Sequence, residues 1–144
     1  MKKFEKGAAM VKPSKNLVGR SEIGHKNSFC SDIESVETVM TESKNYKNEI
    51  EQIRYIEKKL GFEAGYLGDN PKEIYLIYLK PDQIKNPRIP DGNESGANKF
   101  WIPGGYTASE DAIGVPEIII DCSELPTKLF DEKYNNKIPL DNFK

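Results

Sequence analysis

The amino-acid sequence predicts an α+β fold, in which N-terminal helices pack on a small antiparallel β-sheet. Apolar residues recur at helical spacing between residues 32 and 60, and continuous β-branched and aromatic runs follow between residues 73 and 121. Helices followed by strands, without a regular alternation of the two, are typical of this class. A chain of 144 residues is long enough to form one domain with a hydrophobic core.

Two helices are expected in the first half of the chain. Ser31 and Glu34 form a capping-box pattern, which predicts a short helix over residues 32–42 with Ser31 as its N-cap. A longer apolar stripe predicts a second helix over residues 46–60, and Gly61 is the expected C-terminal stop.

The strands are expected in the second half of the chain. The run over residues 73–80 is apolar throughout, which indicates a strand that is buried on both faces. Residues 99–102 and 117–121 are two further candidates, and residues 62–67 are a weaker one. We expect the helix over residues 46–60 to pack on a sheet that contains the three stronger strands.

Charge is distributed unevenly along the chain. Residues 1–27 contain seven Lys/Arg and two Asp/Glu, whereas residues 28–144 contain fourteen and twenty-one. Because residues 1–27 also lack apolar periodicity, they are predicted to be a flexible basic lead-in that folding does not require, with one domain over residues 28–144. No run of apolar residues is long enough for a membrane-spanning segment.

Several common site types are not indicated by this sequence. Cys30 and Cys122 fit no metal-ligand spacing, although they could pair with each other. His25 is the single histidine and is expected to be a solvated residue of the lead-in. No zinc-peptidase, EF-hand or P-loop pattern is present, so we expect no metal site and no cofactor.

The segment over residues 88–121 holds the densest set of chemically useful side chains. Five of the eleven glycines and the single tryptophan lie in it. Glycine- and proline-shaped loops often present binding or catalytic groups. A pair of hairpin turns with solvated side chains is the alternative interpretation.

The side chains of this segment are compatible with acid–base chemistry that does not use histidine. RNA cleavage through the ribose 2′-hydroxyl needs a base, an acid and cations or hydrogen-bond donors for the phosphate. Glu117 is the candidate base, and Lys99 and Arg88 are the candidate phosphate-binding cations. Thr107 and Ser109 are candidate hydrogen-bond donors, although each of the five could instead be a solvated or turn-capping side chain.

Aromatic side chains in the same segment could contact a substrate. Trp101 and Tyr106 could stack on a base, and the alternative for Trp101 is an anchor in the core.

The strings Gly-Asn-Glu-Ser-Gly-Ala-Asn-Lys-Phe-Trp-Ile-Pro-Gly-Gly-Tyr-Thr and Gly-Val-Pro-Glu-Ile-Ile-Ile-Asp resemble the C-terminal toxin domains of bacterial polymorphic and contact-dependent growth inhibition systems. The resemblance covers about residues 45–121 and implies a barnase/EndoU/RelE-like ribonuclease fold. It implies an RNA substrate, with tRNA as the leading candidate, and a cognate immunity protein that binds and blocks the site. It also implies secretion as part of a larger toxin and delivery to the target-cell cytoplasm. Asn98 is a further candidate substrate-binding residue beside Trp101 and Tyr106.

Two other functions remain open from the sequence. Residues 106–109 and Glu117 loosely resemble the Ser-Thr-Ser and glutamate features of ADP-ribosyltransferase or NAD-consuming toxins. The acidic balance of residues 28–144 would also suit a non-enzymatic immunity or adaptor module that binds a basic partner.

Overall fold

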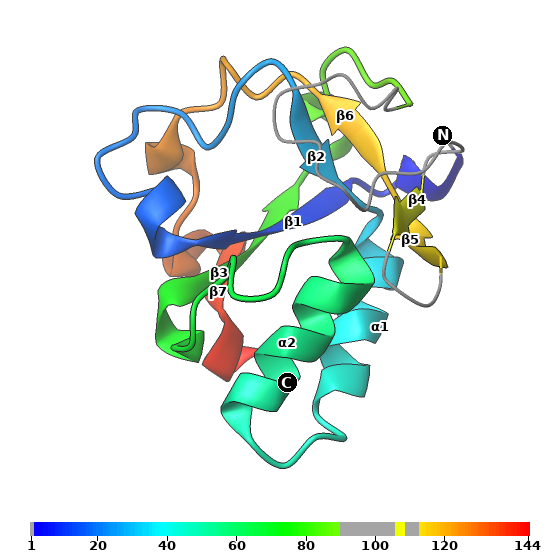
Figure 1. The fold of residues 1–144 in the computed structure, drawn as a ribbon. Coiled ribbons are helices and arrows are strands. Elements are labelled where there is room, and N and C mark those ends of the chain that lie inside the picture. Colours follow the sequence, from blue (N-terminus) through cyan, green and yellow to red (C-terminus); the bar gives the residue numbers. More distant parts are fainter. Residues whose placement is uncertain (1, 90–105, 109–112) are drawn as a thin grey trace.

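Two α-helices pack side by side against a curved antiparallel sheet in the computed structural model of this chain (Figure 1). The structure describes residues 2–89, 106–108 and 113–144. Helix and antiparallel sheet occur together, so the fold is α+β.

Both predicted helices are present. Helix α1 spans Ile33–Ser43, and its N-cap is Asp32, whose side chain accepts a hydrogen bond from the Ser35 amide at 3.0 Å. The expected N-cap, Ser31, lies one residue too early, because its backbone pairs with β1 instead. Helix α2 spans Glu49–Leu60 and ends, as predicted, at Gly61, which has a φ of 81°.

The strands form three antiparallel sheets within the described part of the chain. A three-stranded sheet has the order β1-β3-β7, and two-stranded sheets join β2 to β6 and β4 to β5. The strand bounds are β1 Ala8–Pro13, β2 Ser28–Cys30, β3 Ile74–Leu79, β4 Tyr106–Ala108, β5 Ile113–Pro116, β6 Ile118–Ile120 and β7 Lys137–Pro139. Single-turn 3-10 helices lie at Lys2–Phe4, Ser14–Asn16, Pro71–Glu73, Pro81–Gln83, Thr127–Leu129, Glu132–Tyr134 and Leu140–Asn142.

The N-terminal segment belongs to the folded domain. Strand β1 lies within residues 1–27 and precedes both helices, so the prediction that helices come first is wrong. Ala8 and Ala9 are fully buried, and Leu17 and Ile23 also belong to the core. The prediction that residues 1–27 are a lead-in outside the domain is therefore wrong.

The predicted strands are only partly as expected. Strands β3 and β6 confirm the runs at residues 73–80 and 117–121, but they lie in different sheets rather than in one. Residues 62–67 form turns rather than a strand. The predicted strand at residues 99–102 lies outside the described residues.

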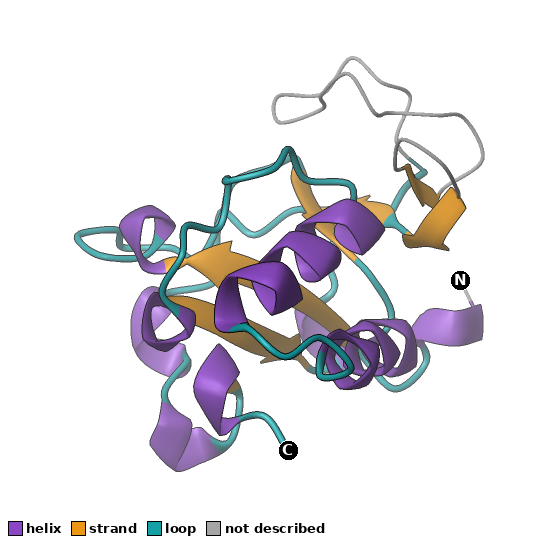
Figure 2. Cartoon of the chain, turned by 60° about the horizontal axis from the view of Figure 1, so that its bottom comes forward, coloured by secondary structure: helices purple, strands orange, loops and turns teal. Residues whose placement is uncertain are grey.

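Alternating side chains of β1 and β3 face two separate hydrophobic clusters. Ala9, Val11 and Leu76 pack with α1 and α2, whereas Met10 and Ile77 pack with β2, β6 and the segments around them. The sheet is thus covered on both faces, which explains why residues 74–79 are apolar throughout. Figure 2 shows the two helices on one side of the sheet.

Removal of residues 1–27 should abolish the cooperative unfolding transition. Strand β1 pairs with β3 over six residues, and Ala9 also exchanges two backbone hydrogen bonds with Ser31. Circular dichroism during thermal denaturation of a chain shortened to residues 28–144 provides the measurement. A shortened chain that melts like the full chain would contradict the role of β1.

A buried charge in α2 should be far more harmful than the same charge on its exposed face. Ile53 is 1 % exposed and Ile50 is 48 % exposed, so Ile53→Asp and Ile50→Asp form a matched pair. Chemical denaturation should give a loss of about 3 kcal/mol or more for Ile53→Asp and less than about 1 kcal/mol for Ile50→Asp. Equal losses would mean that α2 does not pack as described.

Candidate functional site

A cavity of about 270 Å³ lies where three segments far apart in the sequence meet. Strand β1, the turn before β2 and the loop after α2 each supply part of its lining. We call it the His25 cavity. The polar and aromatic side chains that line it include Lys12, His25, Asn27, Phe62, Glu63 and Tyr66.

The turn before β2 is held in place by reciprocal hydrogen bonds. The His25 amide donates to Ser28 Oγ at 2.9 Å, and Ser28 Oγ donates to the His25 carbonyl at 2.9 Å. Gly24 is needed for this approach, since a Cβ at its position would lie 2.3 Å from Ser28 Oγ and 2.9 Å from Cys122 Cβ. The turn thus places His25 at the cavity by tight local packing.

Lys12 is the cation of the cavity. It lies in β1 among buried residues, and its ammonium has no hydrogen-bond or ion-pair partner within the described part of the chain. Burial lowers the pKa of Lys12, and the nearby charge of Arg20 lowers it further against an opposing effect of Cys122. A partly dehydrated ammonium favours a bound anion, because the anion would replace the hydrogen bonds to water that were lost on burial.

His25 is exposed, and its ring is partly fixed by a backbone contact. The Asn27 amide donates a hydrogen bond to Nδ1 at 3.1 Å, so the neutral ring carries its proton on Nε2. Partial burial lowers the pKa of His25, and the charges of Lys12 and Arg20 lower it further. Near neutral pH the ring is therefore mainly a neutral donor through Nε2–H.

Aromatic side chains form the wall of the cavity opposite the sheet. The rings of Phe62 and Tyr66 have centroids 4.8 Å apart, and Lys15 Nζ lies 5.5 Å from the centre of the Tyr66 ring. Asn16 Nδ2 donates to the Tyr66 hydroxyl at 2.7 Å. Burial raises the pKa of Tyr66, while the bond from Asn16 opposes that rise. The wall thus places two aromatic rings beside the ammonium of Lys15.

Arg88, a predicted phosphate-binding residue, lies beside this cavity, but its guanidinium is hydrogen-bonded to oxygen atoms of the protein. Its guanidinium donates to the carbonyl oxygens of Asn86 and Lys26, each at 2.9 Å, and to Asn27 Oδ1. Its own amide and carbonyl pair with Ile119. Arg88 therefore ties the turn that carries His25 to β6.

Glu117, the predicted base, lies between β5 and β6 and does not line the His25 cavity. It is near the buried thiol of Cys30, since the charge of Glu117 is one of the effects that raise the pKa of Cys30. Glu117 makes an interaction of its own and is not a free carboxylate. Glu117 is thus not among the residues that line the cavity with Lys12 and His25.

The remaining predicted site residues are only partly covered by the structure. Tyr106 and Thr107 belong to β4, which pairs with β5 in a hairpin that contacts α2. Asn98, Lys99, Trp101 and Ser109 lie outside the described residues, so their roles stay predictions.

Both cysteines are buried and free, so the possible Cys30–Cys122 pair is not formed. Burial raises the pKa of both thiols. Among the described residues, no group of three or more His, Cys, Asp or Glu side chains is placed to hold a metal ion. No helix in the described ranges is long and apolar enough to cross a membrane.

Sequence reasoning missed Lys12 and His25 because both lie in the segment expected to be a lead-in. One signal was available: Lys12 interrupts the apolar run Ala8-Ala9-Met10-Val11, where a charge is unusual. Nothing local links Lys12 to residues 62–66, which approach it only in the folded chain. Comparisons with protein-family models, with curated proteins and with solved structures found no match.

Removal of the Lys12 charge should raise the pKa of His25. The cation disfavours the imidazolium form, so Lys12→Met should bring the pKa back toward the ordinary value of 6.5. A pH titration of the single imidazole NMR signal measures it, with the exposed Lys47→Met as the matched control. An unchanged or lower His25 pKa in Lys12→Met would show that the two groups do not interact.

Proposed function

We propose that this chain is a ribonuclease that cleaves RNA by metal-independent acid–base catalysis at the His25 cavity. The observation that carries the proposal is the half-buried side chain of Lys12, which shares the cavity with His25 and has no anionic partner among the described residues. A partly desolvated cation gains from an anionic partner, and a phosphodiester oxygen would supply one.

The cavity contains groups for both proton transfers of the reaction. Glu63 is an exposed carboxylate on the wall and can take the proton of the ribose 2′-hydroxyl. Lys12 can stabilise the charge on the phosphate and give a proton to the departing 5′ oxygen, since its lowered pKa makes it a better acid. Neutral His25 can donate through Nε2–H to a phosphate oxygen. One proton leaves the 2′-hydroxyl and one proton is given to the departing 5′ oxygen. The products are therefore a 2′,3′-cyclic phosphate and a free 5′-hydroxyl.

The basic residues near the cavity support a polyanionic substrate. Lys15 and Arg20 lie near Lys12, so part of the N-terminal positive charge is close to the cavity, while the whole chain has a net charge of −2. A local cationic surface on an acidic protein favours binding at one place over general binding to nucleic acid.

The resemblance of residues 45–121 to bacterial toxin domains supports the wider setting of the proposal. In that setting the chain has a barnase/EndoU/RelE-like fold and acts on tRNA in the cytoplasm of a target cell. It reaches that cell as part of a larger secreted toxin, and a cognate immunity protein neutralises it. The predicted contributions of Lys99, Thr107 and Ser109 to catalysis, and of Asn98, Trp101 and Tyr106 to binding, belong to the same proposal. Glu117 is the alternative base, and Arg88 supports the turn that carries His25.

The protein should cleave total tRNA in excess EDTA and leave 2′,3′-cyclic phosphate ends. Loss of a general base or of a phosphate-stabilising cation lowers rates by about 10²–10⁴-fold. We expect losses of that size for Glu63→Gln and Lys12→Met, read by gel and by end-group analysis. Glu117→Gln tests the base predicted from the sequence, and Glu51→Gln, on the exposed surface of α2, is the matched carboxylate control.

Three results would redirect the proposal. If Glu117→Gln is inactive and Glu63→Gln is active, the base assigned from the sequence replaces the one assigned from the cavity. A protein that leaves RNA intact and consumes NAD belongs with the NAD-consuming toxins. If both substrates stay intact, a non-enzymatic immunity or adaptor module becomes the better interpretation.

A further inference from the structure

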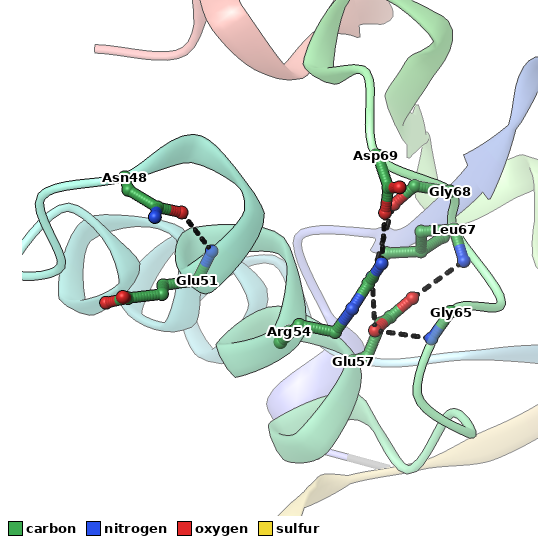
Figure 3. Close-up of polar contacts among 8 residues, drawn as sticks. All are labelled: Asn48, Glu51, Arg54, Glu57, Gly65, Leu67, Gly68 and Asp69. Atoms are coloured by element: carbon green, nitrogen blue, oxygen red, sulfur yellow. Dashed lines mark hydrogen bonds and ion pairs between the residues drawn. The ribbon is translucent and has the colours of Figure 1, made fainter.

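Glu57 is a buried carboxylate whose interactions point to a role at the His25 cavity. It lies near the end of α2, is 1 % exposed and does not itself line the cavity. Arg54 is its ion-pair partner, with Nη1 at 2.8 Å from Glu57 Oε1. Arg54 also donates to the Gly68 carbonyl at 3.2 Å and to Asp69 Oδ1. Figure 3 shows these contacts gathered between α2 and the loop that follows it.

The carboxylate holds the loop by its backbone. Glu57 Oε1 accepts from the Gly65 amide at 3.0 Å, and Oε2 accepts from the Leu67 amide at 2.8 Å. The loop has no ladder of strand hydrogen bonds to define it, and Gly61, Gly65 and Gly68 adopt positive φ angles. Its conformation therefore depends strongly on a few polar contacts, of which those to Glu57 are buried.

The two anchored amides lie directly on either side of the cavity wall. Tyr66 is between Gly65 and Leu67, and Glu63 is joined to Tyr66 by a backbone hydrogen bond of 3.1 Å. Leu67 points into the core formed with the helices and is 3 % exposed. Glu57 holds the backbone on both sides of Tyr66, and the buried side chain of Leu67 anchors one of these sides in the core. The wall therefore has little freedom to move relative to β1 and Lys12.

We propose that Glu57 is the positioning residue of the His25 cavity, fixing the loop over residues 61–69 so that Glu63 and Tyr66 face Lys12. Its effect on activity rests on the proposed ribonuclease function, whereas its effect on the wall does not. Glu57 acts through the loop and does not touch the substrate, because its carboxylate is buried and already accepts three hydrogen bonds.

Glu57→Gln provides the test of this role. The amide keeps the size of the side chain but has one acceptor oxygen, so one loop amide faces an NH₂ group instead of an oxygen. We expect a rate loss of about 10–100-fold on tRNA, since a misplacement of about 1 Å can cost that much. Glu51→Gln, on the exposed surface of the same helix, is the matched control and should keep the wild-type rate.

Two readouts separate positioning from general destabilisation. The ¹³Cζ signal of Tyr66 should titrate with a pKa nearer to the ordinary value of 10 in Glu57→Gln, because the ring leaves the environment that raises its pKa. In the double variant Glu57→Gln/Glu63→Gln, the rate should stay within about threefold of Glu63→Gln alone, since the wall then has no base to position. Both measurements belong at a temperature well below the unfolding transition.

The outcomes of the two proposals can be told apart. An unchanged Tyr66 pKa in Glu57→Gln, or a full additional rate loss in the double variant, overturns the positioning role. A wild-type protein that does not cleave RNA overturns the proposed function, and the Tyr66 titration then decides the positioning role alone. Should Glu57→Gln fail to fold, Glu57→Asp keeps the charge but shortens the reach, and it should give the same Tyr66 shift.

Discussion

Strand β1 carries hydrogen bonds on both of its edges, and the other elements are arranged around it. It pairs with β3 from Ala8 to Pro13 on one edge, and Ala9 exchanges bonds of 2.8 and 3.0 Å with Ser31 on the other. Ala8 and Ala9 are fully buried, and their small side chains let the helices and the second sheet approach the strand closely. Gly7 marks the same crowding, since a Cβ there would lie 2.1 Å from the Leu79 carbonyl oxygen. The cavity lies beside the last residues of β1, where Lys12 meets the turn before β2 and the loop after α2.

The elements that the sequence predicted are those with strong local signals. The stripe through Ile53 and Ile56 and the stop at Gly61 are properties of consecutive residues, so they located α2 without tertiary information. Strand β1 had no such signal, because two alanines in a short run do not distinguish strand from helix. Its partner β3 lies more than sixty residues further along the chain, so the pairing cannot be read from the neighbourhood of either strand.

The candidate site was less predictable than the fold. A glycine-rich segment was expected to bring all the chemistry together, yet the described cavity is formed by residues 10–12, 25–29 and 62–66. Arg88 illustrates the difficulty, since a guanidinium near a loop resembles a phosphate ligand in sequence but is directed at three oxygens of the protein in the structure. Charge asymmetry is the informative feature of the sequence, because Lys12 belongs to the cation-rich residues 1–27 and lies half-buried in β1.

The half-buried charge of Lys12 links the stability of the fold to the binding of an anion. Partial burial of this charge, which lowers the pKa of Lys12, makes the folded state less stable than it would be with the charge fully hydrated. An anion that binds only the folded chain returns that stability by mass action, at about 1.4 kcal/mol for each tenfold excess of ligand over its dissociation constant. The unoccupied domain is therefore the more easily unfolded form, and occupancy of the cavity and resistance to unfolding rise together.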